Sequence, residues 1–100
     1  AEQRCIQEHP EFRLLPSEYF ERQIYASFWF EKKMLQSAIE KYPNNMMYET
    51  DFPHATSMSP GPQSTAQAPR DYAQEVLSGL KPDHLQKLLH DNAAMLYQID

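Results

Sequence analysis

Two short apolar runs, separated by a segment of helical pattern, constrain the fold of this chain more than any other feature. The first run, Ile24–Phe30, is dominated by aromatic and β-branched residues, which favour a strand. Nearly all of its positions are apolar, as in a strand buried on both faces. The second run, Met46–Thr50, is a shorter strand pattern that stops before Asp51. A crossover of about a dozen residues is long enough to join parallel strands. The sequence therefore predicts a right-handed βαβ unit and an α/β fold.

The segment between the two runs has the pattern of a crossover helix, Glu31–Tyr42. Its apolar residues recur at helical period and form one stripe, which consists of Met34, Leu35, Ala38 and Ile39. Pro43 follows and ends the helix. The stripe predicts that this helix packs against one face of the strands.

The remaining segments are assigned by their start and stop signals. Residues 1–16 are expected to be irregular. Their main apolar cluster is short and is enclosed by two prolines, Pro10 and Pro16. A long polar loop is expected from Pro53 to Pro69. The other expected elements are a helical turn at Glu18–Glu21 capped by Ser17, helices that begin at Pro69 and Pro82, and a last turn at Asn92–Tyr97 capped by Asp91.

Composition excludes several classes of protein. The 100 residues carry 9 Lys+Arg against 14 Asp+Glu, a formal net charge of −5, and no basic stripe, so no nucleic-acid partner is expected. No apolar stretch approaches the roughly 20 residues that span a bilayer, so no membrane partner is expected. Cys5 is the sole cysteine, which excludes an intrachain disulfide and favours a reducing, cytoplasmic setting.

The candidate site residues follow the two predicted strands. Asp51 directly follows the second strand, and the carboxyl ends of strands are where α/β proteins place metal ligands and general bases. His54 lies three residues on and could shuttle protons near neutral pH. Trp29 ends the first strand and could stack on a flat, unsaturated substrate. The structural alternatives are a turn-capping acid, a solvent-exposed histidine and a core tryptophan.

These elements and motifs together resemble the carboxyl-terminal part of the amidohydrolase-related family, which includes metal-dependent hydrolases and decarboxylases similar to aminocarboxymuconate-semialdehyde decarboxylase. The resemblance covers nearly the whole chain. It is carried by three stretches in the family's order: Pro16–Phe20 with Ile24–Glu31, Glu49–His54, and Asn92–Tyr97. It implies that residues 1–100 are the C-terminal fragment of a single (β/α)₈ TIM barrel domain, with Ile24–Phe30 and Met46–Thr50 as its last two strands.

The resemblance also implies the chemistry of the complete enzyme. Asp51 would ligate a divalent metal, zinc in the first place, or act as base toward the metal-bound water. The reaction would be hydrolysis or non-oxidative decarboxylation of a small-molecule substrate, with His54 and Trp29 in the site. The sequence holds no His-x-His pair, and a barrel of this kind needs about 250 residues. This chain alone is therefore expected to be inactive and to hold no metal.

A second class of function follows from the small number of predicted strands. Two buried-type strands cannot cover their apolar faces with so few neighbouring elements. The chain is therefore expected to form oligomers or to associate with the missing part of its barrel. The alternative function is a non-catalytic, truncated fragment that acts as an interaction or oligomerising module.

Overall fold

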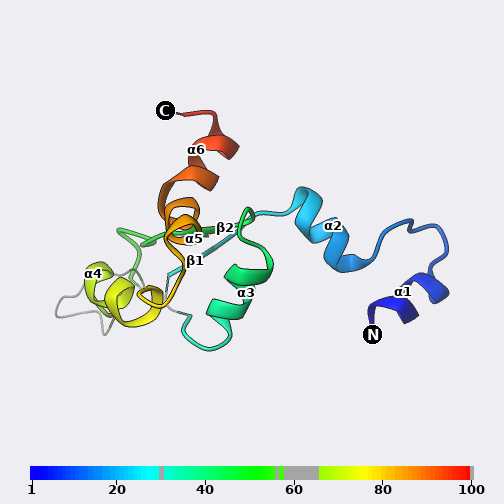
Figure 1. Ribbon diagram of the computed structural model, residues 1–100, viewed down its shortest axis with the longest axis horizontal. Helices are drawn as coiled ribbons and strands as arrows, with labels where there is room; N and C mark the ends of the chain where they lie inside the picture. The colour runs from blue at the N-terminus through cyan, green and yellow to red at the C-terminus, as the bar shows by residue number, and fades with distance from the viewer. Residues whose placement is uncertain (30, 56, 58–65, 100) are drawn as a thin grey trace.

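The computed structural model describes residues 1–29, 31–55, 57 and 66–99, and within them helices pack against one face of a short parallel sheet (Figure 1). In chain order the elements are α1 (Glu2–Glu8), α2 (Pro16–Gln23), β1 (Ala26–Phe28), α3 (Leu35–Lys41), β2 (Met46–Tyr48), α4 (Pro69–Tyr72), η1 (Ala73–Leu77), α5 (Pro82–Gln86), η2 (Lys87–Asp91) and α6 (Asn92–Tyr97). The predicted α/β class and the strand–helix–strand order are confirmed.

The two strands pair in parallel, as the crossover predicted. Ala26 lies opposite Met46 and Phe28 lies opposite Tyr48. Both strands are shorter than the sequence indicated: Ile24 lies outside β1 and is exposed, and Phe30 lies outside the described residues. The expectation that the first strand is buried on both faces is wrong, because Ser27 in the middle of β1 is exposed. Helices cover only the opposite face.

The crossover helix begins later than predicted. Met34, placed in the apolar stripe by its spacing, instead has a left-handed backbone with φ of 61° and is 83% exposed. Helix α3 starts at the next residue, and its turns bury Leu35 and Ile39. The predicted stripe is therefore right at these two positions and wrong at Met34, because a left-handed residue cannot continue a helix of L-amino acids.

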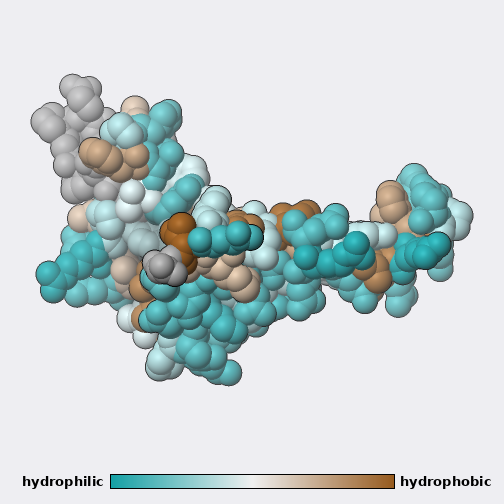
Figure 2. Space-filling model, turned by 90° about the horizontal axis from the view of Figure 1, so that it is seen from above, coloured by the Kyte–Doolittle hydropathy of each residue, from teal (hydrophilic) through white to brown (hydrophobic). Residues whose placement is uncertain are grey.

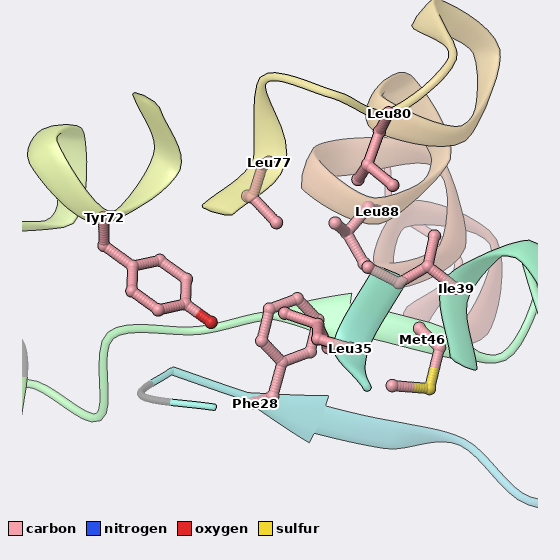
Figure 3. Close-up of a cluster of buried hydrophobic side chains, with 8 residues drawn as sticks. All are labelled: Phe28, Leu35, Ile39, Met46, Tyr72, Leu77, Leu80 and Leu88. Carbon is pink, nitrogen blue, oxygen red and sulfur yellow. The ribbon is translucent and has the colours of Figure 1, made fainter. Parts of the chain in front are cut away.

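The hydrophobic core lies on the covered face of the sheet (Figure 3). Strand residues alternate between faces, so Phe28 of β1 and Met46 of β2 point toward the helices. Tyr72 projects from α4 toward the strands in the same view. The buried apolar side chains are Phe28, Leu35, Ile39, Met46, Tyr72, Leu77, Leu80 and Leu88. The sheet and α3 supply half of this core, and the C-terminal helices supply the other half.

The C-terminal region is formed by two helical stretches, each of which contains a π-helical segment, η1 or η2. Pro69 and Pro82 begin them, as predicted, at a position where the missing proline N–H costs nothing. The predicted cap at Asp91 is wrong. Asp91 has helical angles, φ −64° and ψ −39°, so α6 continues directly from η2. Asn92 is instead buried, and its Nδ2 donates to Pro43 O and Met46 O at 2.7 and 2.8 Å.

The N-terminal segment forms an arm that extends from the body (Figures 1 and 2), and the molecule measures 52 × 30 × 26 Å. The prediction of an irregular start is wrong, since α1 is a helix. Its Glu2 carboxylate accepts bonds from the amide and hydroxyl of Ser17 at 2.7 and 2.9 Å. Ser17 therefore serves this contact and does not cap α2, which starts at Pro16.

A buried amide fixes the arm to the body. The Nδ2 of Asn45 donates to the carbonyl oxygens of Phe20, Glu21 and Ile24, the last two at 2.8 Å. The rings of Phe20 and Tyr42 also lie 4.7 Å apart between centroids. The end of α2 thus has a defined position relative to the turn before β2.

Most of the predicted loop from Pro53 to Pro69 lies outside the described residues. No helix in the described part of the chain is long and apolar enough to span a bilayer.

Candidate active site

The candidate site lies at the carboxyl edge of the parallel sheet. Because β1 and β2 run in the same direction, the residues that follow Phe28 and Tyr48 leave the sheet at one edge. Trp29 comes directly after β1, and Asp51 comes three residues after the end of β2. The backbone therefore brings the predicted site residues to the edge where parallel sheets bind ligands.

Asp51 and His54 lie together in the turn after β2. His54 Nδ1 is 3.3 Å from Asp51 Oδ2, and the amide of His54 donates to Asp51 O at 2.9 Å. Asp51 has a left-handed backbone with φ of 57°, a conformation that aspartate adopts more readily than most residues. The peptide bond between Phe52 and Pro53 is cis. The turn thus directs a carboxylate and an imidazole to one place.

The two side chains of this pair differ in exposure. The His54 side chain is 66% exposed, whereas that of Asp51 is 35% exposed. The imidazole is therefore open to solvent, and the carboxylate lies closer to the sheet. Chemically, a carboxylate can accept a proton, and an imidazole beside it can pass one to water through its ring nitrogens.

Trp29 lies at the end of the neighbouring strand and is half-buried. Its side chain packs against the hydrophobic core, which was the structural alternative to a role in the site. Its amide N–H donates to Glu31 Oε2 at 3.2 Å, which ties the tryptophan to the start of the loop after β1. A substrate contact through its remaining surface stays a prediction.

A metal would need more ligands than the described residues bring together. Catalytic zinc sites normally use three protein ligands and leave one position for water or substrate. No group of three His, Cys, Asp or Glu side chains suitable for a metal occurs in the part of the chain that the structure describes. Asp51, with His54 beside it, fits one part of such a donor set, and the described residues do not complete it.

The sequence analysis did not identify two tyrosines, Tyr48 and Tyr72, that contact the loops after β1 and β2. Tyr72 donates its hydroxyl hydrogen to Glu31 O, in the loop after β1. Tyr48 donates to Pro69 O at 3.3 Å, at the end of the loop that carries Asp51. The signal available in the sequence was a tyrosine at the last position of a strand, followed by a second tyrosine one turn into the next helix.

A carboxylate on η1 joins the same two loops at the surface. Glu75 accepts a bond from Lys32 Nζ at 2.9 Å and another from Gln67 Nε2 at 2.7 Å. These two bonds lower the pKa of Glu75 below its ordinary value. Glu75 is about half exposed, and exposed pairs of this kind stabilise little. The contact nevertheless shows that both loops converge on η1.

The parallel strand–helix–strand unit places this chain in the α/β class, in which ligands bind beyond the carboxyl ends of the strands, where Asp51 and His54 lie. Comparison with known families gives the next step. The sequence matches the model of the family described as Amidohydrolase over residues 4–99, and the chain therefore belongs to the amidohydrolase family. No curated protein and no solved structure matches it.

Proposed function

We propose that this chain is the C-terminal portion of a metal-dependent enzyme of the amidohydrolase family, with Asp51 at its reaction centre. In the complete enzyme, β1 and β2 would be the last two strands of a (β/α)₈ barrel. The reaction would be hydrolysis or non-oxidative decarboxylation of a small molecule. The observation that carries the proposal is the position of Asp51, beyond the carboxyl end of β2 and 3.3 Å from His54.

The family match and the topology support this placement in a barrel. Barrel enzymes have their chemistry at the carboxyl ends of the strands, contributed by residues from several different strands. Here two parallel strands, joined through α3, deliver Trp29 and Asp51 to that edge. A complete barrel has eight strands and about 250 residues. The rest of the site would come from strands beyond those described here.

Within that site, each candidate residue has a defined task. Asp51 would be one oxygen ligand of a divalent metal, zinc in the first place, or the base that accepts a proton from water. His54 would carry protons between the carboxylate and solvent. Trp29 would line the substrate pocket with the part of its ring system that does not pack on the core. The chain alone would then lack catalytic activity.

The test is substitution of Asp51 in the complete enzyme that contains this sequence. Asp51→Asn keeps the shape of the side chain and removes its charge. We expect turnover to fall by at least about a hundredfold, the usual contribution of a positioned acid or base, with little loss of stability. Assays would follow amide and ester hydrolysis and carbon dioxide release in parallel, which also separates the two reactions.

The matched control is Asp83→Asn, which removes the same charge from the exposed first turn of α5. It should leave turnover unchanged. Activity of Asp51→Asn within about tenfold of the parent enzyme would reject the role of Asp51, because a group at the reaction centre contributes more than this.

We also propose that the chain associates through the open edge of β1, the edge that faces away from β2 and pairs with no strand in the described part of the chain. Ala26 N donates to Asn45 O, and Phe28 O accepts from Glu49 N, so the polar groups of these two residues face β2. Those of Ser27, between them, face the other side, since they alternate along a parallel strand. The outer edge of β2 is partly covered, because Asn92 bonds to Met46 O. The open edge therefore suits a further strand, from the rest of the barrel or from a second copy.

Exposed apolar side chains support association as well. Met95, Tyr97 and Ile99 are each more than 60% exposed near the C-terminus. An apolar hollow of about 280 Å³ lies between the C-terminal helices, lined in part by Leu85 and Leu89. Such surfaces normally mark an interface when they form a patch. Figure 2 shows separate apolar areas on the body and on the arm.

Sedimentation velocity over a range of micromolar concentrations tests this association. Ser27→Lys places a charge on the open edge and should shift the chain toward monomer. Ser37→Lys, at an exposed position of α3, is the control and should not. A chain that is monomeric at every concentration, with cooperative unfolding, would exclude self-association. If added amino-terminal barrel strands fail to bind the chain, association with the rest of the barrel is excluded as well.

A further inference from the structure

Two tyrosine rings stack directly beneath the candidate site. Tyr48 is the last residue of β2 and Tyr72 is the last residue of α4. Their ring centroids are 5.8 Å apart and their planes differ by 5°. Tyr72 is 1% exposed and belongs to the core, and Tyr48 packs against that core and against the ring of Phe28. The pair therefore has a fixed position relative to the sheet.

Each hydroxyl group of the pair reaches the backbone of a different site loop. The Tyr72 hydroxyl donates to Glu31 O, and the Glu31 carboxylate in turn accepts a bond from the amide of Trp29. The Tyr48 hydroxyl donates to Pro69 O, where the loop that begins beside Asp51 ends. One ring stack thus holds the loop after β1 through one hydroxyl and the loop after β2 through the other.

Packing alone does not account for the hydroxyl groups, because a phenylalanine would fill the same space in an apolar core. A buried hydroxyl is unfavourable unless it is hydrogen-bonded. Burial, together with the nearby Glu31 and Tyr48, raises the pKa of Tyr72 to about 12. The Tyr72 hydroxyl group therefore stays protonated, and remains a donor to Glu31 O, across the physiological pH range.

We propose that Tyr48 and Tyr72 are positioning residues: Tyr72 holds Glu31, which is bonded to Trp29, and Tyr48 holds Pro69, where the loop that begins beside Asp51 ends. The proposal rests on the proposed function for the meaning of the site. Its physical content is independent of catalysis: each hydroxyl group fixes the position of the backbone carbonyl that it contacts. Tyr72 acts on Trp29 through Glu31, and Tyr48 acts on the end of the second loop at Pro69.

The test uses one reporter for each hydroxyl group in the full 100-residue chain. Trp29 is the only tryptophan, so its emission and its quenching by acrylamide report on the first loop. The backbone amide chemical shift of Arg70, whose nitrogen is joined to the Pro69 carbonyl, reports on the bond from Tyr48. Tyr72→Phe should shift the Trp29 emission to the red and increase quenching, with little change at Arg70. Tyr48→Phe should change the amide shift of Arg70 and leave Trp29 emission nearly unchanged.

Tyr97→Phe is the matched control, because Tyr97 is 66% exposed and should affect neither reporter. If Tyr72→Phe does not fold, Glu31→Ala breaks the same connection at an exposed residue and should give the same shift in Trp29 emission. Two folded phenylalanine variants that leave both reporters unchanged would overturn the proposal. If Asp51→Asn leaves the turnover of the complete enzyme unchanged, the proposed function is rejected. The two measurements on the tyrosine variants remain valid in that case.

Discussion

Asn92 offers the sharpest test of how the C-terminal helices are held to the sheet. It is 2% exposed, and its Nδ2 donates to Pro43 O and Met46 O at 2.7 and 2.8 Å. Asn92→Ala removes both donors and leaves two carbonyl groups without this partner. A buried polar group that loses its partner costs about 1–3 kcal/mol, so two such groups should cost about 2–6 kcal/mol. The free energy of unfolding of a whole domain is about 5–15 kcal/mol, so this loss is a large part of it.

Urea unfolding, followed by far-UV circular dichroism, measures this loss. With a slope of about 1.5 kcal/mol per molar urea, a loss of 3 kcal/mol lowers the midpoint by roughly 2 M. Asn44→Ala is the control. Asn44 is an exposed asparagine with one bond, from Lys87 Nζ at 2.8 Å, and its removal should cost less than about 1 kcal/mol. Equal midpoints for the two variants would refute the role assigned to Asn92.

The remaining predictions concern pH and metal content. The pKa of Tyr72 rises from 10.0 to about 12 on folding. This group therefore contributes its full stabilisation below pH 10, and loses up to about 3 kcal/mol as the pH rises through 12. In Tyr72→Phe this part of the alkaline decrease in unfolding free energy should be absent; an unchanged decrease would assign it to other groups. Elemental analysis after dialysis should find no stoichiometric metal in the chain alone, and one zinc per chain that is lost in Asp51→Ala would contradict this.

The sequence predicted those parts of the fold that depend on periodic burial. Leu35 and Ile39 recur at helical spacing and are buried, and the two apolar runs form parallel strands around that helix. Pro69 and Pro82 begin helices because the fixed proline backbone suits the first turn. These signals are local, so one segment of sequence is enough to read them.

The errors arose where a contact between distant residues decided the local conformation. Helix α1 gains the contact of Glu2 with Ser17, fifteen residues away. Asp91 has the composition of a cap, yet α6 passes through it because Asn92 is bonded to residues 46 and 49 positions earlier. No pattern within a single window carries this information.

Only part of the candidate site could be predicted, because some of its contacts also join residues that are distant in the sequence. The sequence placed Asp51 directly after the second strand, whereas β2 ends three residues earlier, at Tyr48; the contact of Asp51 with His54 needs only a tight turn. The stacked tyrosines come from elements separated by the long loop, so their pairing depends on how the chain folds back. Trp29 was expected to face either the core or the site, and the structure shows the packing of its inner part against the core.

The division of the core between the two halves of the chain has a consequence for protein synthesis. Phe28 and Met46 receive their cover from Tyr72 and Leu88, which leave the ribosome much later. At about 5–20 residues per second, the 42 residues between Met46 and Leu88 take roughly 2–8 s to translate. During that interval the strands and α3 are complete in sequence but lack the half of their core that the C-terminal residues supply. The apolar side chains of these elements therefore stay partly exposed to water until the last helices emerge.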